Sequence, residues 1–150
     1  MSKYASLAVF AGLTVLASLV GSQFMPDAWY AQLAKPSWTP PKWLFGPVWT
    51  VLYVMIALAG WFAWRALGFG AAVLVWGVQM ALNASWSYMM FGRKDIAMAL
   101  VDIAILWLAI TAFIALTFKS VPKASGLFVP YALWVSFAAA LNFAVWQLNA

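Results

Sequence analysis

The sequence ASGLFVPYALWVSFAAALNFAVWQLNA, residues 124–150, contains 27 residues and no charged side chain. A helix needs about 20 predominantly apolar residues to cross a bilayer, so this stretch is long enough to span a membrane. Its apolar residues follow one another, whereas a strand of a membrane barrel alternates lipid-facing and lumen-facing residues. The stretch therefore predicts a transmembrane helix.

Four further runs of this kind precede it. Lys3, Lys42 and Arg65 are followed by charge-free runs of 23, 22 and 27 residues, and residues 96–118 contain one charge, Asp102. We therefore expect an all-α membrane protein, a five-transmembrane-helix bundle in one domain over 1–150. The expected helices are roughly 4–24, 44–64, 71–91, 96–118 and 126–148.

The composition excludes several classes of protein. Of the 150 residues, 67% are hydrophobic and only 7% are charged, which is too few charges for a soluble domain. The net charge of +5 comes from cations scattered between apolar runs, which is no nucleic-acid footprint. The chain has no Cys and no His, so it lacks the usual ligands of zinc and haem iron and the Ser-His and Cys-His nucleophiles. Lys and Arg are divided four against four between the two sides, so charge does not indicate the orientation in the membrane.

The connection over 25–43 is long and unusual in composition. It holds four of the seven prolines, and four aromatic residues, Trp29, Tyr30, Trp38 and Trp43, stand among them. Prolines favour extended or turn geometry, and tryptophan and tyrosine favour the membrane interface. Two interpretations stay open, an interfacial anchor and a structured lid over a cavity. We expect an ordered loop with Trp38 directed toward a pocket.

The helix over 71–91 carries a polar stripe. Gln79, Asn83 and Ser87 recur every four residues and share one face. Amides are poor lipid-facing groups, so this face should point into the bundle or a cavity. Hydrogen bonding between helices and contact with a ligand are both open for it.

A second stripe on the same helix consists of small residues, Gly77, Ala81 and Ser85. It lies about 200° from the polar stripe, at about 100° per residue, so we expect it to face outward. Small residues let helix backbones approach closely. A homodimer seam and an ordinary contact within the chain are both open.

One acid lies inside an expected span. Asp102 stands about two turns into the fourth helix, and an intramembrane acid is a functional candidate by default. A single acid without a relay partner makes a poor proton pump. We therefore favour a structural role, in which the carboxylate bonds to a neighbouring hydroxyl or amide, or to Arg93 or Lys94.

Two other helices place aromatic rings beside small residues, which leaves room for a flat ligand. These faces are expected to converge with the polar stripe near one membrane side. Their members are Trp49, Tyr53, Ala57, Gly60 and Trp64 in the second helix, and Tyr131, Trp134, Ala138 and Asn142 in the fifth.

The motifs that carry a family resemblance are rich in tryptophan and proline. They are WY at 29–30, KPSWTPPKW at 35–43, GPVW at 46–49, LY at 52–53, QMALN at 79–83 with Trp86, FG at 91–92, ALVD at 99–102, PY at 130–131 with Trp134, FA at 137–138 and LN at 141–142. On these motifs, which span most of the chain, the sequence resembles a bacterial-type member of the TspO/MBR family, that of the translocator protein or peripheral-type benzodiazepine receptor.

The resemblance implies five transmembrane helices around a pocket closed by the first loop. It also implies binding of protoporphyrin-type tetrapyrroles, sterols and benzodiazepine-site drugs, with pocket residues at Trp38, Trp49, Asn83, Trp134 and Ala138. Together with the faces described above, the expected ligand-binding set is Trp38, Trp49, Tyr53, Asn83, Trp86, Tyr131, Trp134, Ala138 and Asn142.

Two departures from the family bear on the ligand. Animal members have a C-terminal sterol motif with Tyr and Arg where this chain has Phe143 and Gln147, which weakens the sterol interpretation. A pocket tryptophan of animal members is Met98 here, so the affinity for drugs is expected to differ.

The residues suit a porphyrin without iron. Tryptophan faces can stack on the flat ring, Lys35 and Lys42 could hold its propionates, and no His or Cys is present to ligate iron. We expect protoporphyrin IX as a ligand, no required cofactor and no metal site.

Three functions remain in competition. The first, which we favour, is a multi-pass protein of a membrane, most simply the bacterial cell membrane, that binds tetrapyrroles as a translocator or receptor. The second is an enzyme that degrades porphyrin in light, with Trp49 and Trp134 as redox partners of the excited ring. The third is a sterol- or lipid-binding scaffold. No general base, metal set or nucleophile supports ordinary catalysis.

Overall fold

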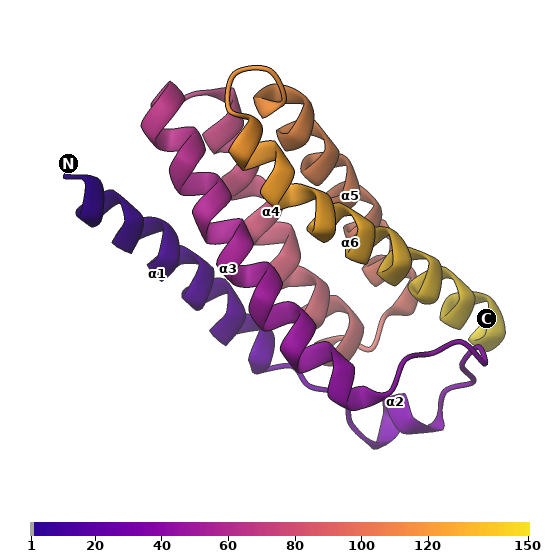
Figure 1. The fold of residues 1–150 in the computed structure, drawn as a ribbon. Coiled ribbons are helices and arrows are strands. Elements are labelled where there is room, and N and C mark those ends of the chain that lie inside the picture. The colour runs from indigo at the N-terminus through magenta and orange to yellow at the C-terminus, as the bar shows by residue number, and fades with distance from the viewer. Residues whose placement is uncertain (1) are drawn as a thin grey trace.

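The computed structural model describes residues 2–150 and is helical apart from short connections (Figure 1). Within this range no residue forms a β-strand, so the all-α prediction is confirmed. The elements in chain order are α1 (Lys3–Ser22), α2 (Ala28–Gln32), α3 (Lys42–Leu67), α4 (Ala71–Ser87), the π-helix η1 (Tyr88–Gly92), α5 (Ile96–Thr117) and α6 (Pro122–Asn149).

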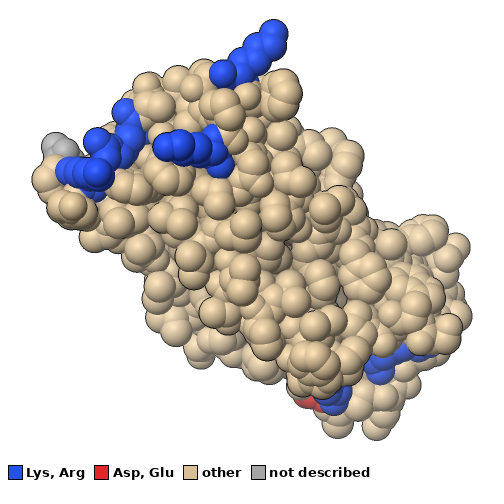
Figure 2. Space-filling model, viewed as in Figure 1, with Lys and Arg blue, Asp and Glu red and all other residues tan. Residues whose placement is uncertain are grey.

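Four of these helices, α1, α3, α5 and α6, are long and apolar enough to cross a membrane. The protein is therefore a multi-pass membrane protein. On the face shown in Figure 2, Lys and Arg lie toward the two ends of the molecule, and the band between them carries no charged atoms. α4 has 17 residues and continues directly into η1.

Two helices extend past the charged residues that bound their apolar runs. α3 begins at Lys42, directly after Pro41, and continues beyond Arg65 to Leu67, where Gly68 at φ 69° stops it. α6 begins at Pro122, four residues before the expected start. A long cationic side chain can reach water while its backbone stays helical, so a charge marks the membrane boundary better than it marks the end of a helix.

The long helices pack in a closed circuit. α5 lies against α4 and α6, α3 lies against α6 and α1, and α1 lies against α4. A short connection usually makes the two helices that it joins antiparallel neighbours. α3 and α4 are joined by a short connection, yet they contact each other much less than each contacts α1.

The junction of α1, α3 and α4 is built around a glycine. The indole of Trp76 lies over Gly60 and donates a hydrogen bond of 2.9 Å to the carbonyl of Ile56. Phe10 of α1 meets the Trp76 ring edge-on, with 4.9 Å between the ring centroids. A side chain at position 60 would occupy the space of both rings, so glycine is what allows α3 and α4 to touch here.

The segment 23–41 and its short helix α2 are held against the end of the bundle at which α6 finishes (Figure 1). Asn149 of α6 accepts a hydrogen bond from the Ala34 N–H at 3.0 Å and donates one to the Ala34 carbonyl at 2.9 Å. Asp27 forms an ion pair of 3.4 Å with Lys94, in the turn before α5. The apolar side chains of Trp29, Tyr30 and Leu33 pack against a small core from η1, α5 and α6.

We expect Gly60→Ala to destabilise the protein. The added methyl group would lie 2.5 Å from Trp76 ring atoms and 2.8 Å from the Phe10 ring. Overpacking of this kind costs about 1–3 kcal/mol, so the thermal midpoint in detergent should fall by several degrees. Gly77→Ala is the matched control, because a Cβ at Gly77 meets nothing within 4 Å. Equal melting of the two variants would contradict this packing.

We expect Asn149→Ala to loosen the loop without unfolding the bundle. The change removes both side-chain bonds to Ala34. A typical hydrogen bond contributes about 0.5–1.5 kcal/mol, so hydrogen–deuterium exchange of the Ala34 amide should become roughly 2- to 12-fold faster. Leu148→Ala, at the exposed neighbouring position, should leave this exchange rate unchanged. Fast exchange at Ala34 in the unmodified protein would argue against the contact.

Candidate functional site

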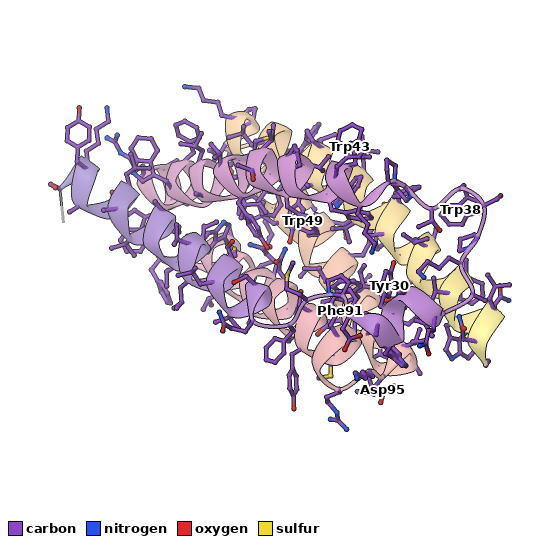
Figure 3. The ribbon with its side chains drawn as sticks, turned by 90° about the horizontal axis from the view of Figure 1, so that it is seen from below. Tyr30, Trp38, Trp43, Trp49, Phe91 and Asp95 are labelled. Carbon is purple, nitrogen blue, oxygen red and sulfur yellow. The ribbon has the colours of Figure 1, made fainter. Side chains whose placement is uncertain are left out.

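The expected ligand-binding residues lie in the half of the bundle next to the loop. They come from three helices and the loop. Figure 3 shows Trp49 between the helices, Trp43 at the outer edge of α3, and Trp38 on the loop where it passes α6. The contributing residues are Trp49 and Tyr53 of α3, Asn83 and Trp86 of α4, Tyr131, Trp134, Ala138 and Asn142 of α6, and Trp38 of the loop.

Four polar side chains form one hydrogen-bonded series across α3, α4 and α6. The Tyr53 hydroxyl donates to Asn83 Oδ1 at 3.0 Å, and Asn83 Nδ2 donates to the Tyr131 hydroxyl at 2.8 Å. The Tyr131 hydroxyl donates in turn to Gln79 Oε1 at 2.8 Å. Both atoms of the Asn83 amide thus have partners within the protein. The sequence left two roles open for the polar stripe, hydrogen bonding between helices and contact with a ligand. The structure shows hydrogen bonding between helices for Gln79 and Asn83.

A second polar contact lies nearer the loop. The Trp86 indole donates to Asn142 Oδ1 at 3.0 Å, and Asn142 Nδ2 donates to the Ile96 carbonyl at 3.3 Å. This contact joins the end of α4 to α6 and to the start of α5. Asn142 is buried and supports the position of the Trp86 ring.

Aromatic rings form a continuous surface along α6. Trp134 lies 5.7 Å from Phe45 of α3 and 5.7 Å from Phe137, measured between ring centroids. Trp38 of the loop meets Phe137 edge-on at 5.6 Å. The surface therefore connects the loop to α3 through Trp134, with Ala138 one turn after it.

Trp49 lies on the α3 side of the same region. Its ring is 5.4 Å from Tyr53 and 6.2 Å from Tyr131. It packs against two tyrosines whose hydroxyl groups belong to the hydrogen-bonded series. The structure thus brings Trp49, Tyr53, Asn83 and Tyr131 together in one cluster.

Some buried polar atoms have no partner within the described residues. Nearly all buried polar groups in proteins are hydrogen-bonded, and an indole N–H can only donate. The Trp134 nitrogen is therefore a buried donor without an acceptor among the described residues. The unpaired buried atoms are Trp134 Nε1, Gln79 Nε2 and Asp102 Oδ1.

Loop charges are arranged around aromatic rings and backbone groups. Lys35 Nζ lies 4.5 Å from the centre of the Tyr30 ring and donates to the Leu33 carbonyl at 3.2 Å. Desolvation raises the pKa of Tyr30. Desolvation also acts to raise the pKa of Asp27, but hydrogen bonds from the Tyr30 N–H and Lys94 lower it overall. Asp27 therefore stays ionised and paired.

The single acid inside a span is bonded to a hydroxyl. The Ser85 hydroxyl donates to Asp102 Oδ2 across the contact between α4 and α5. This is the structural role favoured from the sequence. It also corrects the expectation that Gly77, Ala81 and Ser85 all face outward, because α5 packs over Ser85 while Gly77 and Ala81 stay exposed. Ser85 thus makes an ordinary contact within the chain, and a homodimer seam stays a prediction for Gly77 and Ala81.

Two hollows in the described part of the chain lie away from these residues. One, of about 320 Å³, is apolar and lies between α3 and α6 beside Pro47 and Pro130. The other, of about 510 Å³, is at the end of the bundle opposite the loop. Neither is lined by an expected ligand-binding residue. Within residues 2–150 no group of three or more His, Cys, Asp or Glu side chains could hold a metal ion.

The sequence reasoning missed three members of this region. Phe45 and Phe137 complete the surface around Trp134, and Asn149 fastens the loop. Phe137 lies three residues after Trp134, so its helical spacing could have revealed it. Phe45 and Asn149 meet partners far away in the chain, and no local pattern indicates them. Phe143 and Gln147, which depart from the sterol motif, are exposed.

Comparison with known proteins places this arrangement in a family. The model of the TspO/MBR family matches residues 5–147. The chain is 43% identical to the tryptophan-rich protein TspO of Chlorobaculum tepidum, over 96% of both chains. It is 42% identical to protein CrtK of Rhodobacter capsulatus, over 95% of this chain and 91% of that one. It is 38% identical to the human translocator protein, over 92% and 88%. The chain therefore belongs to the TspO/MBR family.

Proposed function

We propose that this protein binds a tetrapyrrole of the protoporphyrin IX type in the membrane, as a translocator or receptor that also accepts benzodiazepine-site ligands. The site is the loop-side region bounded by α1, α3, α4 and α6. The name of the human relative, translocator protein, is in keeping with a role in transport. The observation that carries the proposal is the unpaired indole N–H of Trp134 in a wall of aromatic rings.

The aromatic composition of this wall suits a flat, apolar ligand. Phe45, Trp134, Phe137 and Trp38 follow one another at centroid distances of 5.6–5.7 Å. Aromatic faces gain about 0.5–1.5 kcal/mol per ring pair beyond the burial of area, and a porphyrin offers a large face. An acceptor atom of the ligand would complete the bonding of Trp134.

The polar series supports the proposal by limiting the other polar contacts. Tyr53, Asn83 and Tyr131 already bond to one another, so their role is to hold Trp49 and the facing helix surfaces in place. Ligand pockets are mostly apolar with a few placed polar groups. Lys35 is engaged with the loop backbone, so the exposed Lys42 is the better candidate to meet a propionate at the mouth.

The site needs a fifth span to enclose it. α4 and η1 together cover residues 71–92 without a break, inside a run that carries no charge from 66 to 92. This length exceeds the roughly 20 residues that cross a bilayer. We infer that α4 with η1 is the fifth transmembrane segment, which places Asn83 and Trp86 within the membrane.

Trp134→Phe should weaken the binding of protoporphyrin IX. The change keeps an aromatic ring and removes the N–H donor. The loss of one hydrogen bond, about 0.5–1.5 kcal/mol, corresponds to about 2- to 12-fold in Kd. Titration followed by porphyrin absorbance measures this effect independently of tryptophan fluorescence.

Trp107→Phe is the matched control, because the indole of Trp107 bonds to Ser136 at an exposed position. It should bind with the affinity of the unmodified protein. Equal affinities of the unmodified protein and both variants would show that the Trp134 N–H does not contact the ligand.

Ala138→Thr should weaken binding in proportion to the size of the ligand. Ala138 is half-buried one turn after Trp134, so added bulk would intrude on a ring stacked there. At about 1–3 kcal/mol for overpacking, Kd for protoporphyrin IX should rise about 5- to 150-fold, and Kd for a smaller benzodiazepine-site drug should rise less. Ala140→Thr, at an exposed position, is the control. A uniform loss for both ligands would point to misfolding instead.

A further inference from the structure

The larger hollow is lined by cations from three helices. It has a volume of about 510 Å³ and lies at the end of the bundle opposite the loop. Lys3 comes from the first turn of α1, Arg65 from the last turn of α3, and Lys123 from the first turn of α6. Figure 2 shows blue side chains gathered toward this end. The folded chain thus brings together three charges that lie far apart in the sequence.

No carboxylate of the described chain neutralises these three cations. The chain has three acids, of which Asp27 pairs with Lys94 at the loop end and Asp102 bonds to Ser85. Asp95 caps the start of α5, also at the loop end. The three exposed cations that line the hollow therefore have no carboxylate partner within the described residues.

Aromatic rings hold the cations in place. The Arg65 guanidinium lies 5.4 Å from the centre of the Trp61 ring, and Lys123 Nζ lies 5.6 Å from that of Phe62. The Trp61 indole is buried and donates to the Lys3 carbonyl at 3.2 Å and to Ser6 Oγ at 3.1 Å. These bonds fasten the start of α1 to α3, so the site is built into the packing of the helices.

The position of the hollow indicates what fills it. It lies at the ends of three helices that are long enough to span a bilayer, and therefore at the depth of the lipid headgroups. We propose that it binds the phosphate headgroup of an anionic membrane phospholipid. Lys3, Arg65 and Lys123 meet the phosphate, and Ser120, which also lines the hollow, offers a hydroxyl donor. A zwitterionic headgroup carries no net charge, so it gains less from the three cations.

The test measures thermal stabilisation of the purified protein in a neutral detergent. Dioctanoyl phosphatidylglycerol should raise the unfolding midpoint in a saturable way, whereas dioctanoyl phosphatidylcholine and inorganic phosphate at equal concentrations should not. A cation near an anionic lipid contributes about fivefold in affinity. Arg65→Gln with Lys123→Gln should therefore raise the half-saturating lipid concentration about 25-fold.

The control removes one exposed cation from the loop end, with Arg93→Gln, and should keep the original half-saturating concentration. If the double variant does not fold, Lys123→Gln alone, at an exposed position, should raise that concentration about fivefold. An equal loss in the control, equal stabilisation by phosphatidylcholine, or saturation by inorganic phosphate at the same concentration would overturn the proposal.

Discussion

Tyr53, Asn83, Tyr131 and Gln79 are hydrogen-bonded in sequence at the centre of the bundle. Lipid tails are as apolar as the helix surfaces, so no hydrophobic force selects one arrangement of helices inside a bilayer. Polar groups do favour one arrangement of the helices, because an unpaired polar group in hydrocarbon costs several kcal/mol. Asn83 bonds to Tyr53 of α3 and to Tyr131 of α6, and rotating or sliding α3 or α6 would break one of these bonds. The series thus sets the depth and rotation of three helices.

The same constraint divides the candidate site into two parts. Tyr53, Asn83 and Tyr131 have their polar atoms paired within the protein, and their contribution to a ligand is a fixed surface. Trp134 keeps an unpaired donor and stands among rings from α3, α6 and the loop. A rigid wall lowers the cost of binding any ligand, because little ordering is left to occur.

How much the sequence could predict depends on the range of each interaction. The four-residue spacing of Gln79 and Asn83 predicts an inward face, and both residues are buried. Spacing within a helix does not identify the partner helix, so the tyrosines that bond to Asn83 could not be named. For the same reason the sequence predicted a hydroxyl or amide partner for Asp102 but could not name Ser85. Charge-free runs predicted the long helices. No local sequence pattern predicted the short helix α2 or the hydrogen bonds between Ala34 and Asn149.

The π-helical turn η1 gives this end of the bundle an unusual sensitivity to the length of the chain. Its backbone bonds join residues five apart, as from the Arg93 N–H to the Tyr88 carbonyl at 2.7 Å. Trp86 and Phe91, also five apart, meet edge-on at 5.6 Å, and Phe91 receives the Tyr30 ring of α2. In an α-helix residues five apart point about 140° away from each other. Deleting one residue within 88–92 would allow an ordinary α-helical turn. It would also rotate Phe91, on which Tyr30 of α2 packs, to another side of the helix. A single-residue gap at this point between two related sequences therefore signals a different loop geometry.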